Sequence, residues 1–183
     1  MRKNETLNTL KLYRVSFGIN FLLFLFFGLF SLFFPSNFSF LNYILRVCDT
    51  GGDFLPSLLK FWAENLLPVC VAFLLGLTIY EPIFSALFSS VLGIIYSLDI
   101  YTLLSDYKLF FAITMIFIKL CTNWIYLWYL SYVSSVSVTV YTGTVPLTKK
   151  LDYIFMAKYI VWFSMFACLL LLLCIAQCIM FRI

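Results

Sequence analysis

Long uncharged runs dominate the pattern of hydrophobic and polar positions along this chain. No charged residue occurs between Arg14 and Arg46, and positions 15–34 are almost entirely apolar until Pro35 ends the run. About 20 apolar residues are enough to cross the roughly 30 Å hydrocarbon core of a bilayer. The pattern therefore predicts a transmembrane helix over 15–34, preceded by a polar tail.

Two shorter uncharged runs follow, at 65–80 and 82–98. They are separated by Glu81 and Pro82. A residue before proline disfavours the helical conformation, whereas proline itself opens a helix well. The pattern predicts two spans joined as a tight helical hairpin, with a re-entrant pair of half-spans as the alternative.

Two further runs, at 109–130 and 159–181, complete the set. The segment 131–148 between them is uncharged and rich in Ser, Thr and Val, which alternate as they would in a strand. An isolated strand is marginal, so a loop, an amphipathic surface segment and an extension of the fourth helix all remain open. The whole chain, 1–183, is predicted to be one all-α domain, a polytopic transmembrane helical bundle of about five spans.

Composition agrees with this assignment. The chain is 64% hydrophobic and only 11% charged, against about 45–50% and about 25% in soluble domains. A soluble globular protein and a disordered chain are therefore excluded. The formal net charge of +4 is scattered along the sequence, which excludes nucleic acid as a partner and leaves membrane lipid as the expected surroundings.

The positions of Lys and Arg predict the orientation in the membrane. Cytoplasmic segments of membrane proteins carry an excess of these residues. A cytoplasmic tail at 1–14 places seven basic residues inside and four outside. We therefore expect a plasma-membrane protein with its N-terminus in the cytoplasm and its C-terminus outside.

Few residues are suited to catalysis or metal binding. The chain has no His, and five of its six Cys fall within predicted spans, leaving Cys48 as the only one expected outside. Cys174 and Cys178 share a helix face, but a metal or redox pair is disfavoured without His or a CxxC motif. We predict no catalytic residue, no cofactor and no metal site, and hence no enzyme.

Lys119 is the only charged residue inside a predicted span. Such a residue is a functional-site hypothesis by default. With Thr122, Asn123 and Tyr126 it forms a polar stripe at helical spacing that faces other helices. The stripe indicates either an ion or substrate path, with a carboxylate of another subunit as one possible partner, or structural packing. In the favoured structural interpretation Lys119 snorkels and Asn123 bonds a neighbouring helix.

Small residues form a second pattern, at Gly76 in one run and at Ser89, Ser90 and Gly93 in the next. Small side chains at spacings of three and four let helices approach closely. The favoured interpretation is packing within the hairpin, and the alternative is a docking surface for another membrane anchor.

The segment order and local residues resemble the stage II sporulation protein M family. In 61–76 an aromatic at Trp62 is followed by Asn65 and then by a helix with Gly76, as in that family. Further similar segments are 86–93 and 155–177. The resemblance implies a non-enzymatic membrane scaffold that anchors two cell-wall hydrolases, stage II sporulation proteins D and P, for peptidoglycan degradation during engulfment.

The leading hypothesis is accordingly an interaction protein. Its expected partner surface combines the end of the first outer loop, at Trp62, Glu64 and Asn65, with the small-residue positions Gly76, Ser89 and Gly93. The rival hypothesis is a small permease or transporter subunit that uses the polar stripe around Lys119 and Asn123. A holin-like or immunity membrane protein is the third.

Overall fold

Five helices make up most of the computed structural model, which describes residues 2–33, 54–76, 78–141 and 153–180. No strand occurs in these ranges, and the predicted all-α helical bundle is confirmed. The helices are α1 (Arg2–Phe33), α3 (Phe54–Leu75), α4 (Glu81–Asp106), α5 (Leu109–Tyr141) and α7 (Tyr153–Met180).

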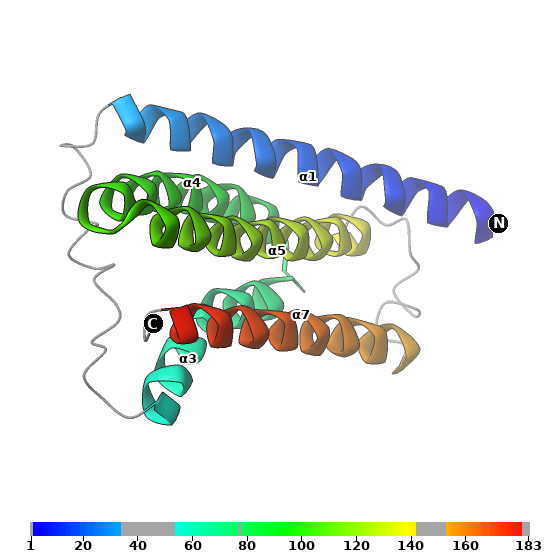
Figure 1. Ribbon diagram of the computed structural model, residues 1–183. Helices are drawn as coiled ribbons and strands as arrows, with labels where there is room; N and C mark the ends of the chain where they lie inside the picture. The colour runs from blue at the N-terminus through cyan, green and yellow to red at the C-terminus, as the bar shows by residue number, and fades with distance from the viewer. Residues whose placement is uncertain (1, 34–53, 77, 142–152, 181–183) are drawn as a thin grey trace.

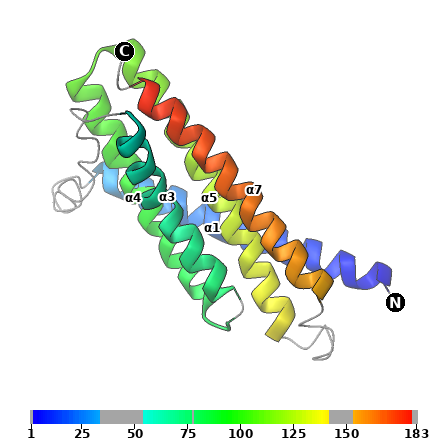
Figure 2. The same cartoon turned by 90° about the horizontal axis from the view of Figure 1, so that it is seen from below.

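The helices form three layers (Figure 1). Helices α4 and α5 form the middle layer, α1 lies on one face of it, and α3 and α7 lie together on the other face. Figure 2 shows that α1 crosses the other helices at an angle. The two chain termini lie at opposite ends of the bundle (Figure 1).

Four helical segments are long and apolar enough to cross a membrane: Lys11–Phe33 of α1, all of α4, all of α5, and Ala157–Met180 of α7. The apolar part of α3, Asn65–Leu75, is shorter, although α3 lies beside α7 in the same bundle. The large side chains on the outside of α1 are mostly apolar and exposed, including Phe26 and Phe33. This is the expected surface for a helix whose solvent is lipid.

Several helices are longer than the apolar runs from which the spans were predicted. Helix α5 continues past residue 130 to Tyr141, so the extension is correct for 131–141, and 142–148 lies outside the described residues. Helix α4 runs past residue 98 and includes Asp99. Helix α3 begins at Phe54, which places the expected end of the outer loop inside a helix. Helix α1 extends back to Arg2, into the expected tail.

The small residues of α4 do not pack within the expected hairpin. Helix α4 does begin at Glu81 with Pro82 in its first turn, as expected. However, α4 packs mainly against α1 and α5, whereas α3 packs mainly against α7. The reason is visible at Gly93 of α4, where an added Cβ would collide with the backbone carbonyl of Phe24 in α1. The small-residue face of α4 is therefore occupied by α1.

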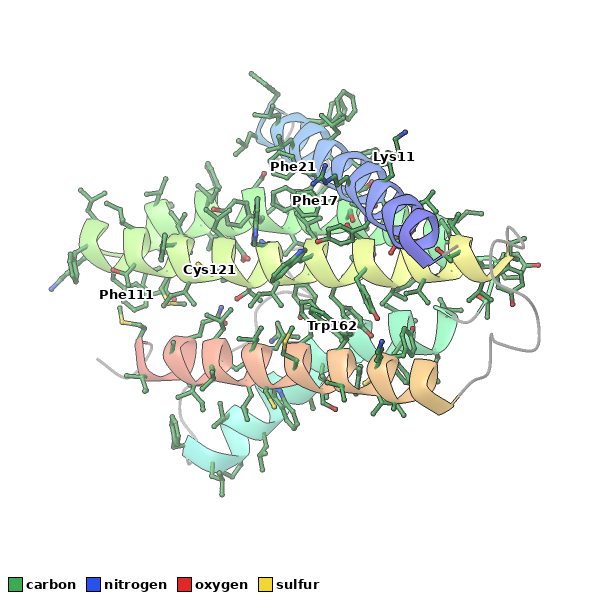
Figure 3. The ribbon with its side chains drawn as sticks, turned by 90° about the vertical axis from the view of Figure 1, so that its right-hand side faces the viewer. Lys11, Phe17, Phe21, Phe111, Cys121 and Trp162 are labelled. Atoms are coloured by element: carbon green, nitrogen blue, oxygen red, sulfur yellow. The ribbon has the colours of Figure 1, made fainter. Side chains whose placement is uncertain are left out.

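Aromatic contacts hold α1 against the middle layer. Phe17 and Phe21 point from α1 toward α5 (Figure 3), where their rings meet Trp124 edge to face at centroid distances of 5.4 and 5.9 Å. Such pairs favour edge-to-face geometry because the ring edge is positive and the face negative. On the other side of α5, Tyr129 meets Phe166 of α7 at 4.9 Å. Helix α5 is thus covered by aromatic rings on two sides.

Candidate intramembrane polar site

An ion pair joins the two helices of the middle layer. Lys119 Nζ on α5 lies 2.5 Å from Asp99 Oδ2 on α4, and the two side chains are 26% and 21% exposed. The partner of Lys119 is therefore in the same chain, and a carboxylate from another subunit is not needed. The favoured interpretation of a snorkelling lysine is replaced by a direct charge pair.

The pair has a clear physical reason. A lone lysine near the centre of a spanning helix costs about 2.5–3.5 kcal/mol on insertion scales. An adjacent carboxylate cancels its net charge. Asp99 can do so because it lies inside α4 and not in a loop beyond it.

The predicted polar stripe of α5 faces other helices, as expected. Gln177 Nε2 of α7 lies 3.4 Å from Thr122 Oγ1, and the Tyr126 hydroxyl donates to the backbone carbonyl of Asn65 in α3 at 2.5 Å. Asn123 is buried, with 9% exposure. Together with the ion pair, one face of α5 makes polar contacts with α3, α4 and α7.

A proline in α3 accompanies the contact with Tyr126. Pro68 lies inside α3 and has no backbone N–H to donate to the carbonyl four residues earlier. The carbonyl that loses its helical partner is that of residue 64, and the carbonyl of the next residue, Asn65, accepts the Tyr126 hydroxyl. Proline is tolerated in such a helix because neighbouring helices satisfy the backbone.

The expected partner surface lies largely within the bundle. Gly76, Ser89 and Gly93 are buried, and the Trp62 indole donates to the Ala167 carbonyl of α7 at 3.3 Å. The Glu64 side chain lies outside the described part of the chain. Gly93 lies at the crossing of α1 and α4, and Gly76 lies against Tyr159 of α7 and Val133 of α5. Burial removes these small residues from any surface that could dock a partner.

Two further contacts between helices were not predicted. Asn20 Nδ2 of α1 donates to Ser131 Oγ of α5 at 3.2 Å, and Ser97 Oγ of α4 donates to the Gly28 carbonyl of α1 at 2.8 Å. The signal for Asn20 was available, because it is the only amide side chain within the uncharged run 15–34. Amides in spanning helices commonly bond across to a neighbour.

Glu81 is the most unexpected residue of the interior. It was expected in the hairpin turn, but its side chain is 0% exposed. Neither of its carboxyl oxygens has a hydrogen-bond partner among the described residues. The hydroxyl of Ser134 faces it, and Tyr129 and Tyr159 lie within electrostatic range. In the sequence Glu81 is recognisable only as an acidic residue before a proline. That pattern predicts a turn and does not predict that the side chain is buried.

Two of the three cysteines of α7 belong to an apolar contact. Cys174 and Cys178 are buried and pack with Leu58 and Trp62 of α3. No group of three or more metal-ligating side chains was found among the described residues. Cys48 lies outside those residues. A thiol in such surroundings behaves as a small hydrophobic side chain.

These features define a class of protein, an α-helical membrane bundle with charged and polar groups in its interior. No known protein family, curated protein or solved structure matches this chain.

Proposed function

We propose that the protein moves a small ion or solute across the membrane, alone or as a subunit of a permease. The observation that carries this proposal is the Lys119–Asp99 pair, a charge pair between two helices that are each long enough to span. Ionisable groups in spanning helices mark ion pathways and proton relays and are a functional-site hypothesis by default. This proposal was the alternative at the sequence level, where Lys119 had no partner.

The polar residues that follow Lys119 along α5 also support this proposal. The pair continues along α5 into Thr122, Asn123 and Tyr126, so polar groups follow the helix for two turns. Tyr126 ends this line at the Asn65 carbonyl of α3. Charged and polar groups that line the contacts between spanning helices are typical of transporter sites.

Flux measured in reconstituted vesicles tests the proposal. Purified protein in liposomes would be assayed for H⁺, Na⁺ and K⁺ movement with trapped indicator dyes, because the solute is not identified. We expect Lys119→Leu to abolish flux and Lys119→Arg to retain part of it. Phe117→Leu is the matched control, since Phe117 is 64% exposed on the same helix. Flux unchanged by Lys119→Leu, or no flux of any of the three ions, contradicts the proposal.

A scaffold is the second candidate, as the resemblance to stage II sporulation protein M implies. It is favoured by the internal bonding of Trp62, Asn65, Thr122 and Gln177, which ties α3, α5 and α7 together inside the bundle. Such a protein would be non-enzymatic and would anchor membrane-bound cell-wall hydrolases. Docking would use the lipid-facing side chains, because the small residues are occupied.

An affinity pull-down from gently solubilised membranes tests the scaffold. The bound proteins would be identified by mass. Co-purification of peptidoglycan hydrolases supports this function, whereas recovery of the chain alone contradicts it. The same preparation tests whether the isolated protein turns over peptidoglycan, which a scaffold would not do.

The orientation is proposed as N-terminus cytoplasmic and C-terminus outside, in the plasma membrane. The excess of basic residues on the expected inner segments supports it, and the position of the termini at opposite ends of the bundle is compatible with it (Figure 1). Reporter fusions at each terminus would test the orientation. Activity of an externally active reporter at the N-terminus contradicts it.

A further inference from the structure

The carboxyl group of Glu81 lies inside the bundle without a well-formed hydrogen bond. Its side chain is 0% exposed, and both oxygens lack hydrogen bonds of acceptable geometry within the described residues, although the Ser134 hydroxyl is near enough to interact with the carboxyl. The hydroxyl of Tyr129, on the facing helix α5, is also buried and unbonded in that part of the chain. Two unsatisfied polar groups therefore occur together in a region where most other polar side chains are bonded.

The surroundings of Glu81 contain hydroxyl groups and no described counter-charge. The Ser134 hydroxyl of α5 lies near the carboxyl, and Tyr129 of α5 and Tyr159 of α7 lie within electrostatic range of it. Tyr159 already donates to the Phe73 carbonyl at 2.9 Å, so its hydrogen is committed to α3. Glu81 makes no salt bridge to any Lys or Arg whose side chain the structure describes.

An ionised carboxylate is a poor occupant of such a place. Burial of a charge without a partner carries a large desolvation penalty, and the group becomes neutral instead. The start of α4 contributes a favourable dipole, but this effect is small beside the loss of hydration. A cation bound to the carboxylate would remove this penalty. A metal ion would need several further oxygen ligands, whereas a proton binds to one carboxylate oxygen alone.

We propose that Glu81, with Tyr129 and Ser134, forms a proton-binding site inside the bundle. In the neutral form the carboxyl O–H donates to a neighbouring hydroxyl oxygen, and the second carboxyl oxygen accepts a hydroxyl hydrogen. The site is distinct from the Lys119–Asp99 pair and does not depend on either function proposed above.

Glu81 lies at the end of α4 that is connected to α3, as the first residue of the helix. Residue 78, shortly before it, is held against α5, because the Ser137 hydroxyl donates to the Thr78 carbonyl. The site therefore lies at an end of a helix and not at its middle.

Infrared difference spectroscopy on the full chain in lipid tests the site. At neutral pH we expect the carbonyl band of a protonated carboxylic acid, shifted in D₂O and lost in Glu81→Gln. Glutamine has nearly the same shape and no charge, so the fold should be retained, which circular dichroism would check. Asp106→Asn is the matched control, because Asp106 is exposed at the other end of the same helix. This control should keep the band.

Glu81→Asp provides a second variant if the glutamine variant does not fold. It keeps a carboxyl group at the site, and we expect its band to move in frequency but to persist at neutral pH. Absence of a Glu81-dependent protonated band at neutral pH overturns the proposal. Loss of the band on adding Na⁺ or K⁺ at constant pH also overturns it, because a metal cation would then be the occupant.

Discussion

The crossing of α1 and α4 gives the sharpest prediction for stability. A Cβ placed on Gly93 would lie 3.0 Å from the backbone carbon of Phe24 and 3.0 Å from the backbone nitrogen of Gly28, and closer still to the Phe24 carbonyl oxygen. These are backbone atoms of a long helix, which cannot rotate away. We therefore expect Gly93→Ala to force the two helices apart.

The magnitude follows from two opposing terms. Replacing Gly by Ala within a helix favours the folded state by about 0.5–1 kcal/mol. Overpacking a well-filled contact costs about 1–3 kcal/mol, and a clash with backbone belongs at the upper end. Gly93→Ala should therefore lower the free energy of unfolding by about 2 kcal/mol relative to the parent chain.

Gly18 and Gly28 supply matched controls on the facing helix. A Cβ on Gly18 would meet nothing within 4 Å, so Gly18→Ala should gain stability or leave it unchanged. A Cβ on Gly28 would lie 3.2 Å from the Gly93 carbonyl oxygen and 3.2 Å from Ser97 Oγ, which predicts an intermediate loss. The gap between Gly18→Ala and Gly93→Ala should be about 3 kcal/mol, roughly a hundredfold in the unfolding equilibrium constant.

Reversible unfolding in mixed detergent micelles measures this series. Tryptophan fluorescence is a suitable probe, because Trp124 lies against Phe17 and Phe21 of α1. If Gly93→Ala is as stable as Gly18→Ala, the close approach of α1 and α4 is not a feature of the folded protein, and the three-layer arrangement fails.

Three further substitutions test individual contacts. A double-mutant cycle on Lys119→Met and Asp99→Leu tests the ion pair by the same unfolding assay. The double variant should lose about 1–3 kcal/mol less unfolding free energy than the two single losses added together. Additive losses contradict the ion pair. Tyr126→Phe removes the hydroxyl that donates to the Asn65 carbonyl and should cost about 0.5–1.5 kcal/mol; an unchanged stability would show that this contact is dispensable. Gly76→Ala places a methyl against the hydroxyl of a buried tyrosine and should cost about 1–3 kcal/mol, while membrane insertion, measured by alkaline extraction, stays intact.

The sequence predicts the spanning helices well because the length of an apolar run directly measures what a bilayer requires. It predicts their ends poorly, and α5 shows why. Residues 131–141 alternate Ser, Thr and Val, which in water suggests a strand. In the bundle the hydroxyls bond back to their own helix, as Ser131 does to the Leu127 carbonyl at 2.6 Å and Thr139 to the Ser135 carbonyl at 2.6 Å. In a bilayer no water is available to bond the backbone N–H and C=O groups, so they must bond one another. Residues 131–141 therefore stay helical.

The candidate site is only half visible in the sequence. Lys119 and its stripe follow from charge and spacing alone. The pairing of Asp99 with Lys119 does not follow from the sequence. Asp99 ends the uncharged run 82–98, and this pattern predicts that it lies in a loop. Glu81 could not be foreseen, since burial depends on which helices enclose the start of α4. Small residues likewise indicate a close approach without specifying the partner helix, and the partner of α4 proved to be α1.

The pairing of α3 with α7 has a consequence for biosynthesis. These two helices lie together on one face of the bundle, although they are the second and the last of the described helices along the chain. During translation α3 leaves the ribosome long before its neighbour does, and helices in membranes insert first and associate afterwards. In a nascent chain stopped after α5, the side of α3 that packs against α7 would therefore face lipid. The bundle can be completed only after α7 has been inserted.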